Sequence, residues 1–179
     1  MTESMKAMKD QQKAMHWAVL ELRTLTARAQ ETGTPPDFTL LRQLMNYLDR
    51  VAEKQHQPNE DEHLFRALEA RAPDLKRLIH RLRRDHSAMT GYRIRLAEAV
   101  GYWQKGDDRS GRHATIVAED YQVFCERHLR EERELLGRLR EVLSEAEWAE
   151  AERGFDSVAD PVAAASSTSE RETAVRQYA

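Results

Sequence analysis

The spacing His-x-x-x-Glu occurs twice in this chain, at His56 and Glu60 and again at His128 and Glu132. Four residues turn an α-helix through about 400°, so the two side chains of each pair lie on one face, one turn apart. An imidazole and a carboxylate held in this way can bind one metal ion or bridge two. The repeat therefore indicates a metal site between helices.

Two further histidines, His16 and His86, lie on other segments with a helical pattern. A single histidine on an apolar helix face is usually a core residue, and a single His-x-x-x-Glu in a charged helix means little. Chance does not easily explain two such pairs and two further histidines at one level. Without a metal, the two carboxylates would be charges buried in the core. The alternative is a bundle with a buried polar network and no metal.

Four long segments with a helical pattern of apolar residues must position these side chains. The first is expected over about residues 5–30, ended by Gly33-Thr34-Pro35-Pro36, and Asp37 is the expected N-cap of the next. The other three are expected over about residues 38–68, 75–103 and 117–142, with breaks at residues 72–74 and 106–108.

Pro58 lies inside the second segment, between His56 and Glu60. A proline cannot donate a backbone hydrogen bond, and its ring collides with the preceding turn of a helix. We therefore expect a kink or a brief break there, before the apolar pattern resumes at Leu64.

Distances along the chain place the candidate ligands at one level. Antiparallel neighbours share a level at equal distances from their connecting turn, and we place the turns near Thr34, Ala72 and Gly106. At 1.5 Å per residue, the candidates differ in level by roughly 3 to 9 Å. The first helix fits less well, because His16 lies about 60° from Val19 at the edge of its apolar stripe.

The fold class follows from long helices and short connections, which predict an all-α protein, an up-down-up-down four-helix bundle. Ser144-x-x-Glu147 has the pattern of a capping box and opens a short C-terminal fifth helix to about Arg153. We assign residues 1–155 to the bundle. Residues 156–179 are small and polar without periodicity, which predicts a disordered C-terminal tail.

The composition limits which kinds of partner and which compartment are expected for this protein. The net charge of −3 over 179 residues gives no case for nucleic-acid binding, and no apolar run is long enough for a membrane helix. The N-terminus lacks the apolar segment of a signal peptide. Cys125 is the only cysteine, so no intrachain disulfide is possible, and we expect a cytoplasmic protein.

The donor set indicates which metal to expect. Four imidazoles and two carboxylates exceed the needs of one tetrahedral zinc. Carboxylates between helices, able to bridge, suit a pair of iron or manganese ions, and the imidazoles favour iron. Two ions that share six protein ligands keep open positions, where dioxygen, peroxide or nitric oxide could bind.

At this point the chain resembles the hemerythrin-like, HHE cation-binding family. The segment His56-Gln57-Pro58-Asn59-Glu60, followed by Leu64-Phe65, is similar to the family's His-His-Pro-Lys-Glu and Leu-Phe. Asp85-His86 resembles its acidic-His step, and His128-Leu129-Arg130-Glu131-Glu132 resembles its His-x-x-x-Glu-Glu. Glu145-Ala146-Glu147-Trp148 and Phe155, near the end of a match over about residues 15–155, resemble its C-terminal helix.

The resemblance implies a four-helix bundle with a non-heme, carboxylate-bridged di-iron centre. It implies Glu60 and Glu132 as bridges and the metal ligands His16, His56, Glu60, His86, His128 and Glu132. One departure is Leu82, which stands where oxygen-carrying hemerythrins have a fifth histidine. The resemblance therefore implies an additional open position at one iron.

We expect a di-iron protein that binds or reacts with dioxygen, peroxide or nitric oxide, and Leu82 favours scavenging or sensing over simple carriage. A peroxide- or nitric-oxide-consuming activity fits this reading. The alternative is a non-enzymatic metal-binding or structural helical module. Of the residues nearby, His63 could be a ligand or a core histidine and Tyr121 a core residue or a hydrogen-bond donor. We expect an inert thiol at Cys125 and surface positions for His80 and His113.

Overall fold

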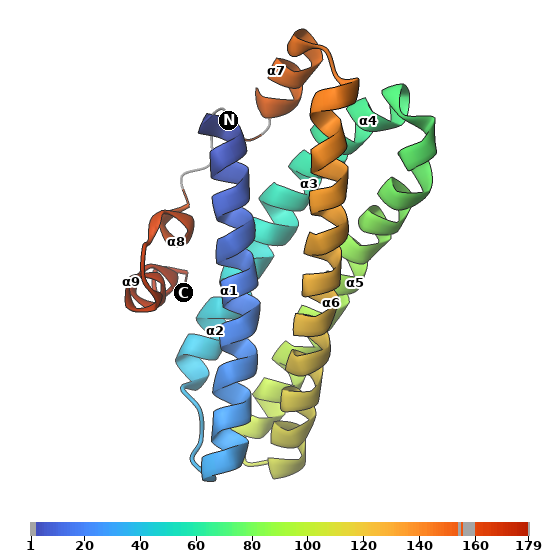
Figure 1. Cartoon of the computed structure of the whole chain (residues 1–179). Helices are drawn as coiled ribbons and strands as arrows, with labels where there is room; N and C mark the ends of the chain where they lie inside the picture. The colour runs from blue at the N-terminus through green and yellow to red at the C-terminus, as the bar shows by residue number, and fades with distance from the viewer. Residues whose placement is uncertain (1–2, 154, 156–159, 179) are drawn as a thin grey trace.

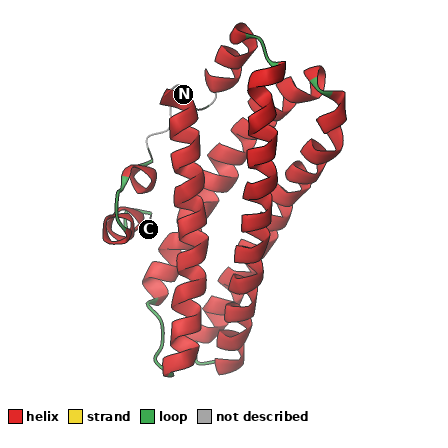
Figure 2. Ribbon diagram, in the orientation of Figure 1, coloured by secondary structure: helices red, strands yellow, loops and turns green. Residues whose placement is uncertain are grey.

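A computed structural model of the chain describes residues 3–153, 155 and 160–178, which contain helices and no strand (Figure 2). Three long helices are α1 (Glu3–Thr32), α5 (Lys76–Gln104) and α6 (Asp108–Val142). A further segment is helical from Phe38 to Arg71. It consists of α2 (Phe38–Tyr47), η1 (Leu48–His56), α3 (Gln57–Asn59), η2 (Glu60–Phe65) and α4 (Arg66–Arg71).

The long helices pack lengthwise around one another. Helix α6 contacts both α1 and α5, and η1 also contacts α1 and α5 (Figure 1). Helix α6 begins at Asp108, nine residues before the expected start at Val117, because Asp107 caps polar first turns that have no apolar pattern. The described residues include no helix with the length and hydropathy that a bilayer span requires.

Three sequence signals at helix ends are confirmed. Gly33 and Gly106, with φ of 66° and 96°, follow α1 and α5, since glycine adopts these angles without steric cost. The Asp37 side chain accepts a hydrogen bond of 2.9 Å from the Leu40 backbone N–H at the start of α2.

A kink or a brief break was expected at Pro58, and the chain stays helical through this residue without a break. Instead, η1 and η2 on either side of Pro58 are π-helical. At the end of η1, the Gln57 N–H donates to the carbonyl of Ala52, five residues back. The wider turns accommodate a residue that cannot make the α-helical hydrogen bond.

Two hydrophobic clusters lie along the bundle, one toward each end. The first includes Val19, Leu48, Met89 and Cys125, and the second includes residues before Gln11 in α1 and after Glu60 in the second segment. On all four long helical segments, a gap separates the residues of one cluster from those of the other. A layer of buried polar residues fills that gap: Gln11, Gln12, His56, Glu60, His86, His128 and Glu132.

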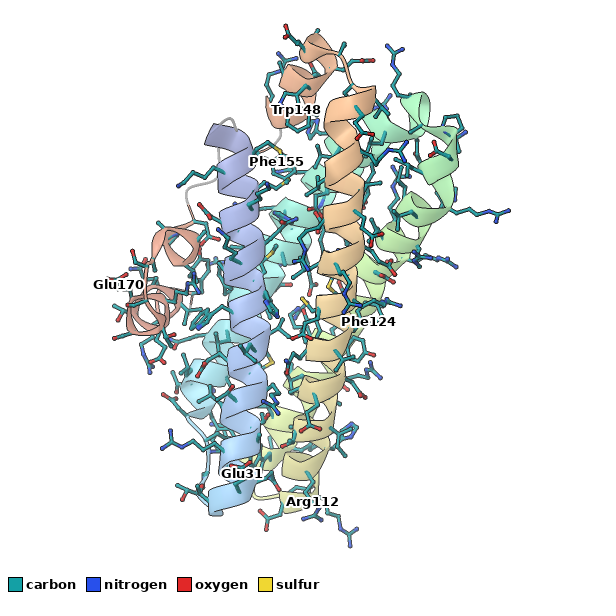
Figure 3. The ribbon with its side chains drawn as sticks, viewed as in Figure 1. Glu31, Arg112, Phe124, Trp148, Phe155 and Glu170 are labelled. Carbon is teal, nitrogen blue, oxygen red and sulfur yellow. The ribbon has the colours of Figure 1, made fainter. Side chains whose placement is uncertain are left out.

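The short helix α7 (Glu145–Arg153) caps one end of the bundle, as Figure 3 shows with Trp148 and Phe155 labelled. The predicted capping box is present: the Ser144 N–H donates to Glu147 Oε2 over 3.0 Å, and the Glu147 N–H donates to Ser144 Oγ over 3.3 Å. Phe155 is buried, and its ring centroid lies 5.8 Å from that of His56.

The prediction of a disordered tail is wrong for residues 160–178, which form α8 (Pro161–Ala164) and α9 (Thr168–Val175). Helix α8 packs against α1 and α9 against α2, and Val162 and Val175 are fully buried. Tyr47 donates a hydrogen bond of 2.8 Å to Asp160. A few apolar residues anchor this segment, too few to give a periodic pattern. Residues 156–159 and 179 of the expected tail lie outside the described residues.

Candidate metal centre

Five of the six predicted ligands meet in the polar layer. They form two groups, His56, Glu60 and Glu132 in one and Glu60, His86 and His128 in the other. Within each group the candidate ligand atoms lie within 4.8 Å of one another. Every one of these residues is at most 5% exposed. Because Glu60 belongs to both groups, the two groups are adjacent halves of one site.

Glu60 is at the centre of this arrangement. Its Oε1 lies 2.8 Å from His56 Nε2, one turn earlier, and its Oε2 lies 3.4 Å from His86 Nε2 on α5. On α6, His128 Nε2 lies 4.0 Å from Glu132 Oε2. Each imidazole therefore presents the same nitrogen, Nε2, to the carboxylates.

The other nitrogen of each imidazole faces an acceptor outside the site. His56 Nδ1 lies 3.0 Å from Gln11 Oε1, and His86 Nδ1 lies 3.4 Å from the Asp61 carboxylate. His128 Nδ1 lies 3.6 Å from Asp85. The acceptors of His56 and His86 favour the tautomer with its proton on Nδ1, which leaves Nε2 as the metal-binding atom, whereas His128 Nδ1 has no hydrogen-bond partner among the described residues.

Sequence reasoning missed these outer acceptors. Asp85 precedes His86 in the chain, yet its carboxylate lies beside His128 Nδ1 on the neighbouring helix. It also accepts a hydrogen bond of 2.8 Å from Arg127. Asp61 follows Glu60 directly and could have been considered from its spacing. Gln11 gave no signal, because an isolated glutamine in a charged helix is common.

Three buried polar atoms that face one another in the site have no hydrogen-bond partner among the described residues. In the described part of the chain, His56 Nε2, Glu60 Oε1 and His86 Nε2 have no hydrogen-bond partner. His56 Nε2 and Glu60 Oε1 are close, but they are not aligned for a hydrogen bond. Buried polar atoms without partners are costly and rare. A cation among these atoms would satisfy all three, so the residues fit a metal ion.

The carboxylates have opposite pKa shifts. Burial would raise the pKa of Glu60, but the positive charge of His56 and the closeness of both His56 and His86 hold it well below its ordinary value. Burial, together with the negative charge of Glu60, raises the pKa of Glu132 well above its ordinary value. Burial would lower the pKa of His86, but Asp61 and Glu60 raise it to about 9. Near neutral pH, Glu132 therefore keeps its proton and His86 its positive charge, and a metal cation would replace these protons.

The structure does not bring His16 to the site. Its side chain is 36% exposed and its Nε2 lies 3.5 Å from Glu126. His16 is at the level of Met15 and Val19 in the first hydrophobic cluster, beyond the polar layer. Helix α1 instead contributes Gln11 and Gln12, and Gln12 Nε2 donates a hydrogen bond to Glu132 Oε1. The expected level was correct only to within about one turn, and one turn separates Gln12 from His16.

The other histidines lie outside the site. His63 is partly exposed and belongs to neither group. His80 and His113 are exposed, as predicted, and His80 Nε2 lies 3.1 Å from Glu69.

A small inner cavity adjoins the centre. It has a volume of about 30 Å³ and is lined by site residues together with Leu48, Met89, Tyr121 and Cys125. Burial raises the pKa of the Cys125 thiol to about 12 and that of Tyr121 well above its ordinary value. Both side chains are therefore neutral, and the cavity has a mostly apolar wall opposite the carboxylates.

Comparison with known proteins agrees with the residues of this centre. Residues 4–140 match the hemerythrin family, described as the hemerythrin HHE cation binding domain. No curated protein and no solved structure matches the chain. The match covers all five buried His and Glu residues of the polar layer. With most of its length matched, the chain belongs to the hemerythrin HHE cation-binding domain family.

Proposed function

We propose that the protein is an up-down-up-down four-helix bundle, with α7 as its short fifth helix, that holds two iron ions. The observation that carries this proposal is the pair of groups that share Glu60. Two imidazoles and one carboxylate, as in Glu60, His86 and His128, suit non-heme iron with open positions. A carboxylate common to both groups suits a bridge between two ions.

We further propose that dioxygen, peroxide or nitric oxide binds at this centre, with scavenging or sensing favoured over carriage. The inner cavity of about 30 Å³ supports a ligand of only a few atoms. Its wall of Leu48, Met89 and neutral Cys125 carries no charge, so the metal itself would hold the ligand. When bound, iron would supply the electrons and the open coordination position that these ligands require. The chain's own residues hold the ions, exclude bulk water and limit ligand size.

Metal analysis and an optical spectrum of protein loaded with iron anaerobically test this function. Two iron ions per chain, and an absorption change on exposure to air, are the expected result. Protein that takes up no iron would contradict the proposal. Consumption of peroxide or nitric oxide by loaded protein, absent in His128→Ala, would separate a scavenger from a sensor.

A further inference from the structure

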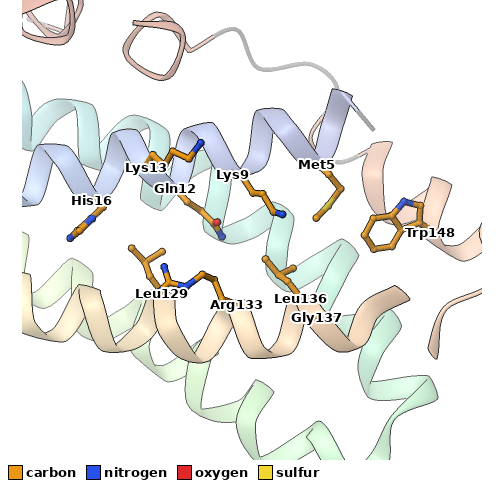
Figure 4. A pocket seen from close by; sticks show the side chains of 10 residues that line it. All are labelled: Met5, Lys9, Gln12, Lys13, His16, Leu129, Arg133, Leu136, Gly137 and Trp148. Carbon is orange, nitrogen blue, oxygen red and sulfur yellow. The ribbon is translucent and has the colours of Figure 1, made fainter. Parts of the chain in front are cut away.

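An open groove runs along the bundle between α1 and α6, outside the metal centre (Figure 4). Its volume is about 610 Å³. Trp148 of α7 lies at one end, and His16 lies toward the other. This space is far larger than the inner cavity of about 30 Å³ and can admit small ions with their hydration shells.

The groove is lined by cationic side chains. Lys9 and Lys13 come from α1 and Arg133 from α6, whereas none of its described lining residues is acidic. Asp10 offsets part of this charge from outside, since its carboxylate lies 2.8 Å from Lys13 Nζ. A concave surface lined by charges of one sign concentrates ions of the opposite sign.

Two residues, Gln12 and Leu129, line both the groove and the inner cavity. Gln12 is only 8% exposed, and its amide donates a hydrogen bond to Glu132 of the centre. A single layer of side chains therefore separates the groove from the centre, and Gln12 connects the two.

We propose that this groove is the access route by which small inorganic anions reach the metal centre, and that the Gln12 side chain is its gate. The cations at the rim gather the anion, and displacement of Gln12 from Glu132 opens the way inward. The proposal rests on the proposed function, because it requires a metal for the anion to reach.

The first test needs no metal. Trp17 and Trp103 are each 8% exposed, so a dissolved quencher reaches mainly the partly exposed Trp148 in the groove, and a Trp148→Phe variant supplies the background. Iodide is the anionic probe and acrylamide the neutral one. We expect Arg133→Glu to lower the iodide quenching constant about twofold or more and to leave that of acrylamide unchanged. Arg109→Glu, the same charge change at the far end of α6, should alter neither.

The second test uses iron-loaded protein and rapid mixing with azide or nitric oxide. Gln12→Ala should raise the binding rates of both ligands, and Arg133→Glu should lower only that of azide. Unchanged rates in Gln12→Ala, or equal effects of Arg133→Glu and Arg109→Glu, would overturn the proposal. If the protein takes up iron but Arg133→Glu leaves the iodide quenching constant unchanged, this proposal alone is overturned. Failure to load iron would overturn the proposed function as well.

Discussion

The Gln12 amide of α1 donates a hydrogen bond to the Glu132 carboxyl of α6. Among the long helical segments, α1 alone has no buried imidazole in the described polar layer. This hydrogen bond links α1 to the centre that the other three segments form. Helix α1 therefore contributes amides to the site, Gln11 behind His56 and Gln12 beside Glu132.

The placement of His16 leads to the first prediction. His16→Ala should keep the full iron content, because this side chain is partly exposed and pairs with Glu126. The matched change His86→Ala should lose iron, because His86 is buried with its Nε2 facing Glu60. Metal analysis of both variants, with helicity checked by circular dichroism, makes the comparison. Loss of iron in His16→Ala would show that this histidine moves to the centre when metal binds.

Removal of metal should lower the thermal unfolding midpoint. The unfolded chain lacks the site, so a ligand at 100 times its Kd stabilises the folded state by about 2.7 kcal/mol. For a chain of this size that corresponds to roughly 5 to 10 °C. Calorimetry with and without a chelator measures the difference. Glu60→Gln, which changes the carboxylate shared by both groups, should abolish it. A midpoint in the unmodified protein that does not respond to chelator would argue for a metal-free helical module.

Acid should release α7 before it unfolds the bundle. Hydrogen bonds from Ser144 and Arg71 hold the pKa of Glu147 at about 2, below its ordinary value of 4.5. A lowered folded-state pKa contributes stability that is present above pH 4.5 and is lost as the pH falls toward 2. Trp148 fluorescence should report this loss between those values. Glu147→Gln should remove the pH dependence, and a transition of equal size in that variant would assign it to another carboxyl group.

Cys125 should resist thiol reagents while the protein is folded. With a pKa of about 12, roughly one thiol in ten thousand is ionised at pH 8, and the side chain is 5% exposed. Labelling with a chromogenic disulfide should therefore proceed only in denaturant. Fast labelling of native protein would indicate that the cavity opens readily to solvent.

The C-terminal helices should contribute measurably to stability. Val162 and Val175 are fully buried, and replacing either with alanine should cost about 1 to 3 kcal/mol. Val123, which is 68% exposed, provides the control and should change little. Urea denaturation of the three variants tests this. Equal midpoints would mean that α8 and α9 are not packed in solution.

The residues of the centre could be predicted where they interrupt an apolar stripe. His56, His86 and His128 each lie within such a stripe, and their distances from the turns place them at one level. Gln12 could not be found in this way, because an amide carries no charge and its spacing is not diagnostic. The error at His16 arose because counting from turns is uncertain by about one helical turn. The packed tail was missed because two valines give no periodicity.

The π-helical turns around Pro58 have a consequence for how this chain could vary. A hydrogen bond that reaches five residues back encloses one residue more than an α-helical turn does. Removing one residue between Leu48 and Gln57 could convert η1 to regular α-helix while the chain remains helical. The later residues of the segment would keep their orientation relative to α2, because the wide turn holds its additional residue without rotating those beyond it. Glu60 would therefore stay in the centre, so the segment could lose one residue at this turn without losing its metal chemistry.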